Sequence, residues 1–254
     1  MLVQNMSVHR IVVVTKRPYE AVAELSKHFD MVDEQGEICI AIGGDGTFLE
    51  ATRKVDCPIL LIRGGESNSL GFHADARVDE LPTVIERLKA GDYQVEKHRK
   101  LRVTQDNVSS DAVNDAVLFR ANPVVIHFKV SYFDEEGRPE PLFPDTVKGD
   151  GVIVSSEIGS TGYNYFAGGP VILGADVATV TPICANHRCS IVSEKNFEVE
   201  LLKNEASLQC DGVEVGRLVV GDTFTVSRSD RLVRIVRLTG MESFSRKLSR
   251  LHGF

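Results

Sequence analysis

The stretch ICIAIGGDGTFLE, residues 38–50, decides the fold of this chain. Its five apolar residues predict a buried strand, its glycines a tight turn, and its last residues the start of a helix. Because glycine has no Cβ, the backbone of the turn can adopt φ > 0 and approach a ligand closely. The N–H groups that open the following helix suit an anion. The stretch therefore predicts a strand–turn–helix unit that binds a phosphate or a nucleotide.

Asp45 is the one carboxylate in this anion-friendly turn. A negative side chain there would repel a phosphate, so we expect Asp45 to have a function of its own. This function could be binding Mg²⁺ or accepting a proton. The alternative is an ordinary tight turn in which Asp45 caps the helix. Both interpretations keep the same fold.

The first third of the chain alternates strand and helix patterns. Apolar runs predict strands, and apolar residues at helical spacing predict helices, in the order 11–14, 22–29, 38–42, 48–52, 58–62 and 79–91. Pro18 is expected to open the first of these helices. This β-α-β-α-β-α order predicts a parallel sheet with helices on its faces. In such sheets ligands bind beyond the carboxyl ends of the strands, where the glycine turn lies.

Beyond Gly91 the pattern changes to short β-rich runs separated by turns such as Asp211-Gly212. These runs predict an antiparallel β domain. We place an α/β domain at residues 1–95, joined by the returning tail 238–254, and a β-rich domain at residues 96–237.

The tail predicts one more helix. Phe244, Leu248 and Leu251 have helical spacing, and Arg246, Lys247 and Arg250 fall on the opposite side. We expect this helix to pack back on the body of the protein; the alternative is a helix on a membrane surface. The predicted fold is thus an α/β parallel-sheet domain plus a mainly antiparallel β domain, with a terminal helix packing back.

The amino-acid composition excludes several classes of binding partner. The net charge of −7 argues against nucleic acid or an anionic membrane as the main partner. The five cysteines are odd in number and form no C-x-x-C pair, which predicts reduced, buried cysteines in a cytoplasmic protein. Cys184 and Cys189 flank His187 but lack a second ligand pair, so no metal site is predicted from protein ligands. No window approaches the length of a transmembrane helix.

A second glycine-rich segment follows in the β-rich region. Gly149-Asp150-Gly151 precedes a strand-like run, after which come Gly159–Tyr163 and Gly168–Pro170. Thr161 offers a hydroxyl where glycines allow close approach, and Tyr163 offers an aromatic face for a base or a ribose. An ordinary hairpin with turn glycines is the alternative.

Two shorter elements add to this picture. Asn114-Asp115 could read an adenine amino edge or a ribose diol, because an amide both donates and accepts hydrogen bonds and a carboxylate accepts them. A common turn is the other interpretation. Asn68 lies close before Leu70-Gly71-Phe72, which could equally be a loop anchored by one buried ring.

The order of these pieces closely resembles the NAD kinase family. The matching motifs are G-G-D-G-T (43–47), Asn68 to Phe72, Asn114-Asp115, the glycine-rich segment 149–163, G-G-P (168–170), Thr181–Cys184 and Asp211-Gly212. The resemblance spans roughly residues 11–238. This chain departs from the family pattern in having Asp115 for Glu, Ser156-Glu157-Ile158 for T-P-T, and Gly162 for Ala.

The resemblance implies an NAD kinase, a phosphotransferase with an alcohol acceptor. It would move a phosphoryl group from ATP or polyphosphate to the adenosine ribose 2′-hydroxyl of NAD, giving NADP. Asp45 would be the catalytic carboxylate. The implied nucleotide-binding residues are Gly43, Gly44, Gly46, Thr47, Asn68, Phe72, Asn114, Asp115, Lys148, Asp150, Thr161, Gly162, Tyr163 and Asp211. Mg²⁺, or another divalent cation, would accompany the donor phosphates, and a homodimer or homotetramer is expected.

Other functions stay open at this stage. A lipid or sugar kinase could share only the G-G-D-G turn, and a dinucleotide-binding regulator could lack catalysis. A reverse phosphatase activity on NADP is a further alternative.

Overall fold

The computed structural model describes residues 6–17, 20–64, 71–238 and 244–251. The chain divides into two compact units, one formed by residues 1–97 and 233–254 and the other by residues 98–232. Two long strands, β6 (Tyr93–Gln105) and β18 (Thr223–Leu238), run from one unit into the other. Each unit is described below by itself.

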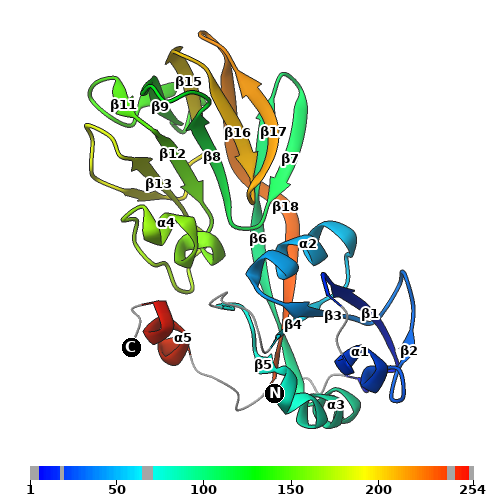
Figure 1. Cartoon of the computed structure of the whole chain (residues 1–254). Coiled ribbons are helices and arrows are strands. Elements are labelled where there is room, and N and C mark those ends of the chain that lie inside the picture. The colour runs from blue at the N-terminus through cyan, green and yellow to red at the C-terminus, as the bar shows by residue number, and fades with distance from the viewer. Residues whose placement is uncertain (1–5, 18–19, 65–70, 239–243, 252–254) are drawn as a thin grey trace. The chain divides into compact units, whose positions relative to one another are not determined.

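The first unit is a parallel α/β sheet, as predicted. Its strands lie in the order β18, β4, β3, β1, β2, with β5 also paired to β4 (Figure 1). The register is parallel from Ile11↔Ile38 between β1 and β3 and from Cys39↔Ile59 between β3 and β4. Its elements are β1 (Arg10–Thr15), α1 (Glu20–Leu25), β2 (Asp30–Met31), β3 (Ile38–Gly43), α2 (Asp45–Lys54), β4 (Ile59–Arg63), β5 (Ala76–Arg77), η1 (Val78–Glu80), α3 (Leu81–Ala90) and α5 (Phe244–Leu251).

The core of this unit explains why its strands are apolar throughout. Every residue of β3 is buried, which a parallel strand covered on both faces requires. Ile40 and Ile42 pack with side chains of α1 and α3, such as Leu25 and Leu88. Figure 1 shows α2 on the other side of the sheet from α1 and α3. The sheet thereby fixes the point at which β3 passes into α2.

The first helix is shorter than predicted. α1 ends at Leu25, whereas the spacing of apolar residues extended the pattern to Phe29. The backbone bonds then change, because the N–H groups of Lys27 and His28 reach back only three residues, to Glu24 and Leu25. Phe29 is buried even so, and it packs into the core from outside the helix. Pro18, the proposed first residue of this helix, lies outside the described residues.

Among the side chains of the terminal helix α5 that the structure describes, residues 246–249, one differs from its prediction. Lys247, which we placed on the polar side, is buried, and its Nζ lies 2.8 Å from Oδ1 of Asp75. Asp75 is also buried and binds Arg237 at 3.0 Å and the N–H of Leu238 at 2.8 Å. A buried carboxylate requires such partners, since an unpaired buried charge is costly. The pair ties α5 to its own unit.

The second unit is antiparallel and β-rich, as predicted. One sheet has the order β14, β13, β12, β8, β16, β17; the other contains β10, β9, β15 and β18, with β11 on β9 and β7 on β6. Its elements are β7 (Val108–Ala112), β8 (Asp115–Arg120), β9 (Ile126–Phe133), β10 (Pro139–Pro141), β11 (Val147–Gly149), β12 (Gly151–Ser155), η2 (Ile158–Thr161), α4 (Tyr163–Phe166), β13 (Ala178–Ile183), β14 (Ile191–Ser193), β15 (Phe197–Lys203), β16 (Ala206–Cys210) and β17 (Val213–Leu218).

A single apolar cluster draws on both sheets of this unit. Leu118 of β8 and Val154 of β12 share it with Phe128 of β9 and Val199 of β15. These residues alternate with less buried neighbours along β9 and β15, which is the pattern of a strand with one face on a core. The packing leaves the ends of β8 and β12 to carry polar side chains.

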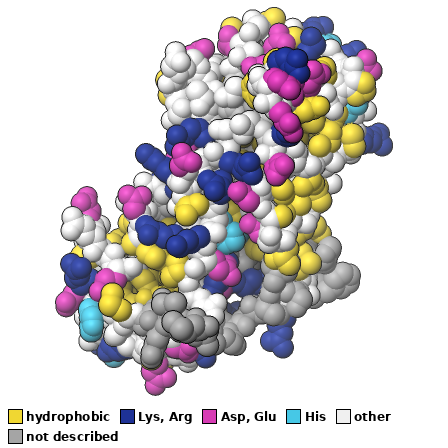
Figure 2. All heavy atoms as spheres, turned by 180° about the vertical axis from the view of Figure 1, so that it is seen from behind, with side chains coloured by type: hydrophobic (Ala, Val, Ile, Leu, Met, Phe, Trp, Pro, Cys, Tyr) yellow, Lys and Arg dark blue, Asp and Glu magenta, His cyan; other side chains and the backbone are white. Residues whose placement is uncertain are grey.

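Surface charges are paired locally. On the face shown in Figure 2, lysine and arginine side chains are interspersed with aspartate and glutamate. Ion pairs of this kind include Arg138 with Asp134 at 2.8 Å and Arg217 with Glu214 at 2.9 Å. None of the helices that the structure describes is long and apolar enough to cross a membrane.

The cysteine prediction is only partly correct. All five cysteines are free. Cys39 and Cys210 are buried, and burial raises the pKa of each thiol to about 12. Cys184 and Cys189, however, are exposed because they lie in the loop after β13, which the apolar run before them does not reveal.

Candidate active site

The glycine turn has the predicted strand–turn–helix geometry. β3 ends at Gly43, α2 begins at Asp45, and Gly44 between them is extended with φ −108° and ψ −172°. The carbonyl of Gly44 accepts the N–H groups of Thr47 at 2.8 Å and Phe48 at 3.2 Å, which starts the helix. Phe48 is completely buried and anchors this first turn in the core. The turn therefore lies at the carboxyl end of a buried parallel strand.

Glycine stands at positions 43 and 46 of the turn for different reasons. A Cβ on Gly43 would collide with Oγ1 of Thr47, a side chain that is itself buried. Gly46 is exposed, and the nearest atom that a Cβ there would meet is Nζ of Lys16 at 3.9 Å. The fold thus explains Gly43, whereas nothing in the described chain crowds Gly46. Room at Gly46 is what a closely approaching ligand needs.

Asp45 does not cap its helix, so the capping interpretation is wrong. The N-cap is Gly44, and no side chain makes a capping bond there. The Asp45 carboxylate instead accepts two backbone N–H groups from the segment after β4: Phe72 donates to Oδ2 and His73 to Oδ1, both at 3.1 Å. These bonds fix the plane of the carboxylate at the start of α2.

Aromatic packing supports the same segment. The His73 ring lies 5.2 Å from that of Phe48 and 5.7 Å, edge-on, from that of Phe72. Of the predicted loop, Phe72 is therefore placed against the glycine turn through its backbone, whereas Asn68 lies outside the described residues. His73 was not foreseen, because its contacts with Phe48 and Asp45 join residues 25 and 28 positions apart and no local pattern marks it.

A second group of predicted residues lies in the β-rich unit, at the turn between β7 and β8. Asn114 forms this turn, and Asp211 holds it from the neighbouring strand pair β16–β17. The Asp211 carboxylate accepts the N–H groups of Asn114 at 2.7 Å, Val113 at 2.8 Å and Asp115 at 3.3 Å. Asp211 and Gly212 both have positive φ, 50° and 74°, which is typical of a tight hairpin turn. The structure thus gives Asp211 a backbone-holding role.

The strand end of β12 packs against the same turn. The Asn114 carbonyl accepts the Ser156 N–H at 2.8 Å, and the Ser156 hydroxyl donates to the Val113 carbonyl at 2.6 Å. A Cβ on Gly159 would collide with the Asn114 carbonyl, so only glycine lets the chain pass there. Ser156 is a residue that the sequence analysis noted only as a departure from a family pattern.

The Asn114 side chain carries an unsatisfied polar atom. Its Oδ1 is buried and has no hydrogen-bond partner among the residues that the structure describes. A buried acceptor without a partner costs free energy, and such atoms therefore call for an explanation. A ligand N–H at this position would satisfy it.

Asp115 lies beside it in an unusual electrostatic state. Its side chain is 6% exposed. Burial, followed by the negative charge of Asp211, raises the pKa of Asp115 to about 7. The carboxyl can therefore be neutral or charged near physiological pH, which a carboxyl in water cannot.

The segment after β12 brings further predicted residues to this turn. Thr161 is buried at the end of η2, and a Cβ on Gly162 would lie 3.6 Å from Nδ2 of Asn114. Tyr163 is 41% exposed. Its pKa is raised by partial burial and then by the charges of Cys184, Asp115 and Asp150. The structure thus gathers Asn114, Asp115, Gly162 and Tyr163.

Lys148 lies on β11, and Asp150 lies between β11 and β12. Asp150 forms an ion pair with Arg120 at 2.8 Å. Lys148 is exposed on β11, and its backbone N–H donates to Oδ1 of Asn186 at 2.8 Å. Both residues thus lie near the loop that follows β13.

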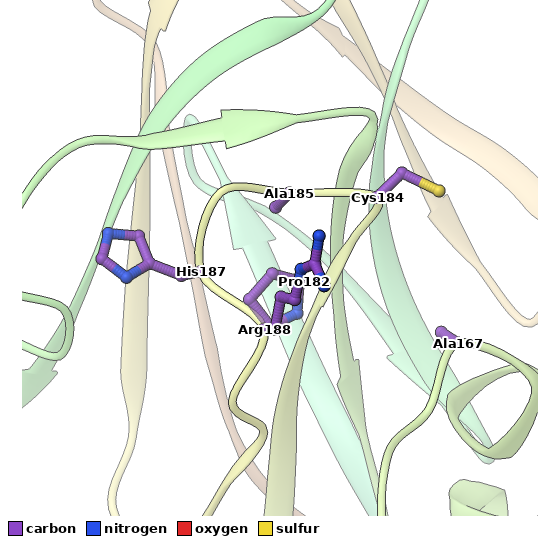
Figure 3. Close-up of a pocket in the computed structure, with 6 residues that line it drawn as sticks. All are labelled: Ala167, Pro182, Cys184, Ala185, His187 and Arg188. Atoms are coloured by element: carbon purple, nitrogen blue, oxygen red, sulfur yellow. The ribbon is translucent and has the colours of Figure 1, made fainter.

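A pocket of about 490 Å³ lies beside this loop. Its lining residues are Ala167, Pro182, Cys184, Ala185, His187 and Arg188 (Figure 3). The size is within the range of small-molecule sites. Cys184 makes the sharp bend at its rim, with φ 44°. In Figure 3 the His187 ring points away from Cys184, and it stacks on Phe143 at 5.3 Å. The sequence marked the Thr181–Cys184 segment but not the pocket.

Asn164 is a buried residue that the sequence analysis missed. Its Oδ1 accepts the hydroxyls of Thr179 at 2.9 Å and Thr181 at 2.7 Å, and its Nδ2 donates to the Pro170 carbonyl at 2.9 Å. A Cβ on Gly169 would collide with it. The G-G-P stretch is therefore explained by packing on Asn164, a link that the spacing alone could not show.

Comparison with known proteins identifies the architecture. The described chain superposes on the NADH kinase of yeast complexed with NADH with a TM-score of 0.82, at 17% identity, covering 98% of this chain and 88% of that one. It superposes on an NAD kinase from Archaeoglobus fulgidus in complex with ATP with a TM-score of 0.74, at 21% identity, covering 96% and 99%. The fold of this chain is thus the fold of these two solved structures.

Sequence comparison identifies the protein family of this chain. Residues 113–238 match the model of the ATP-NAD kinase C-terminal domain. An NAD kinase from Clostridium perfringens is 33% identical over 223 residues, covering 82% of this chain and 77% of that protein. The chain belongs to the NAD kinase family.

Proposed function

We propose that this protein is an NAD kinase that transfers a phosphoryl group from ATP, or polyphosphate, to the adenosine ribose 2′-hydroxyl of NAD. The observation that carries the proposal is Asp45, an oriented carboxylate at the start of α2 in the G-G-D-G-T turn. The membership of the chain in the NAD kinase family supports the same phosphoryl donor and the same acceptor, NAD. The reaction yields NADP.

Asp45 would orient the 2′-hydroxyl and accept its proton. Phosphoryl transfer depends mainly on positioning and charge stabilisation, so a fixed acceptor is more useful than a mobile one. The N–H groups of Phe72 and His73 provide that fixation. Gly43, Gly44 and Gly46 would leave room for the phosphates beside the N-terminus of α2, which favours negative charge, and Thr47 would lie next to them.

The β-rich unit would bind NAD. Oδ1 of Asn114 would accept a ligand N–H such as the adenine amino group, and Asp115 would bind the adenylate part beside it. Thr161, Gly162 and Tyr163 would lie next to the base. Asp150 and Asp211 would contact the nicotinamide half, with the nearby pocket as candidate space, and Lys148 would bind the dinucleotide as well. The bonds of Asp211 to three backbone N–H groups support a role in holding the Asn114 turn.

Mg²⁺ would enter with the donor phosphates. Within the described residues no group of three His, Cys, Asp or Glu side chains is placed to hold a metal ion. Mg²⁺ usually keeps several waters and binds substrate phosphates, so it needs few protein ligands. The ion would neutralise charge on the transferred group.

Two further features complete the proposal. We place the protein in the cytoplasm as a homodimer or homotetramer; five free cysteines support a reducing compartment. The family resemblance, in which a neighbouring subunit contributes ligand contacts, supports the oligomer.

The test is turnover by the purified protein. Incubation with NAD, Mg²⁺ and either ATP or polyphosphate, followed by chromatography of the products, should show NADP. Diacylglycerol and a simple sugar serve as control acceptors and should not be phosphorylated. Binding of NAD without NADP formation would support a regulator instead, and phosphorylation of the control acceptors alone would support a lipid or sugar kinase.

A further inference from the structure

Glu157 stands where the family pattern has a proline, and the structure gives its carboxylate two partners. Oε1 accepts the N–H of Gly174 at 2.6 Å, and Oε2 lies 3.2 Å from Nδ1 of His98 on β6. The side chain is 22% exposed, so these contacts are partly shielded from water. Hydrogen bonds to an ionised acceptor are roughly twice as strong as neutral ones.

The bond to Gly174 closes a loop. The segment between Glu157 and Gly174 contains η2 and α4. Inside it the Ile172 N–H donates to Oγ of Ser160 at 2.9 Å, so the two arms of the loop are joined a second time. Thr161, Gly162 and Tyr163, which we assign to NAD binding, all lie within this closed loop.

Strand β6 anchors the loop at both ends. His98 contacts Glu157 where the loop begins, and Nε of Arg99 lies 3.0 Å from Oδ2 of Asp176 just after it ends. Gly174 has φ 71°, a conformation in which glycine is unstrained but weakly restrained. Without the carboxylate, the loop would lose the bond that restrains this glycine.

We infer that Glu157 is a positioning residue for NAD. Its carboxylate clasps the loop 157–174 so that the Thr161–Tyr163 segment is already in place when the dinucleotide arrives. Preorganisation of this kind improves affinity because less ordering is needed on binding. The inference rests on the proposed function, and it assigns the binding of NAD, not of the phosphoryl donor, to this clasp.

The experiment compares Glu157→Ala and Glu157→Gln with the wild type. Glu157→Ala should raise KM for NAD about tenfold, the factor expected for the loss of a charge-assisted hydrogen bond, and leave KM for ATP and kcat within about twofold. Glu157→Gln keeps one carbonyl oxygen for the Gly174 N–H and should recover most of the loss. Glu136→Ala is the matched control, since Glu136 pairs with Arg138 at 2.7 Å in a turn away from this loop.

A second readout needs no catalysis. Tyr163 and Phe166 are 41% and 67% exposed and are chymotrypsin sites within the loop. Glu157→Ala should be cleaved there several-fold faster than the wild type, and Glu136→Ala should not. Unchanged cleavage, or equal rises in KM for NAD and ATP, would overturn the clasp. Absence of NADP formation by the wild type would instead refute the proposed function, while the cleavage assay would still report on the loop.

Discussion

The carboxylate of Asp211 holds the backbone of Asn114, with Oδ1 accepting the Asn114 N–H at 2.7 Å. The shape of this turn therefore depends on Asp211 and not on the Asn114 side chain. That side chain buries an oxygen that has no hydrogen-bond partner in the described part of the chain, which is a cost in the free protein. Asp211 thus holds the backbone of the turn, whereas the turn presents the side-chain oxygen of Asn114.

Replacing Asn114 by alanine tests this separation. The change removes the unsatisfied oxygen, so the free energy of unfolding should stay within about 1 kcal/mol of the wild type or rise. KM for NAD should rise at least about tenfold, the effect of losing one hydrogen bond to the ligand, while KM for ATP changes little. Steady-state kinetics and urea unfolding measure both. Asp211→Ala is the contrast, because it strips three backbone N–H groups and should lower stability. Equal rises in both KM values for Asn114→Ala would remove Asn114 from the NAD site.

Gly46→Ala separates folding from ligand access at the glycine turn. Apart from its chain neighbours and the backbone of its own helix, a Cβ there meets no described atom closer than 3.9 Å, and alanine is the better helix former by up to about 1 kcal/mol. The variant should therefore melt at the same or a higher temperature than the wild type, yet lose at least about tenfold in kcat/KM because the methyl group occupies the space left for phosphate. Gly43→Ala should behave oppositely, with lower stability from the collision with Thr47. Full activity in Gly46→Ala would mean that no ligand approaches this glycine.

The helices and strands could be predicted because each is specified by residues that are close together in the sequence. The apolar run 38–42 and the glycines after it are contiguous, and β3, the turn and α2 lie where the run placed them. The end of α1 at Leu25 was missed, because the periodic residue Phe29 is buried without being helical.

The partners of charged residues could not be predicted in this way. Asp45 binds N–H groups 27 and 28 residues later in the chain, and Asp211 binds one 97 residues earlier. Lys247 was placed on a polar helix face by its spacing, but its position opposite Asp75 is a property of the packed unit. The candidate residues of the site were thus identified as types, whereas the atoms they bind required the fold.

Asp115→Asn should change how stability depends on pH. The pKa of Asp115 is raised to about 7 in the folded protein, whereas an unfolded chain has about 3.9. Between these values the folded state binds more protons than the unfolded state, so this contribution is full below about pH 4 and falls as pH rises toward 7. Asparagine cannot titrate. The free energy of unfolding of the variant, relative to that of the wild type, should therefore rise by about 3 kcal/mol from pH 5 to pH 8, as measured by urea unfolding. Parallel stability curves for the two proteins would show that the carboxyl titrates normally.

Asp45→Asn tests the chemistry and the geometry of the turn together. Asparagine offers one carbonyl oxygen, so it can accept from only one of the N–H groups of Phe72 and His73, and its own NH₂ would face the other donor. We expect a loss of about 1–3 kcal/mol in the free energy of unfolding. The absence of a proton acceptor should lower kcat at least about a hundredfold. Calorimetric titration with NAD distinguishes the two effects, since the Asn114 turn is formed by other residues and NAD affinity should fall by no more than a few-fold. A variant that keeps near-full kcat at saturating substrates would show that Asp45 holds the Phe72–His73 segment and takes no proton.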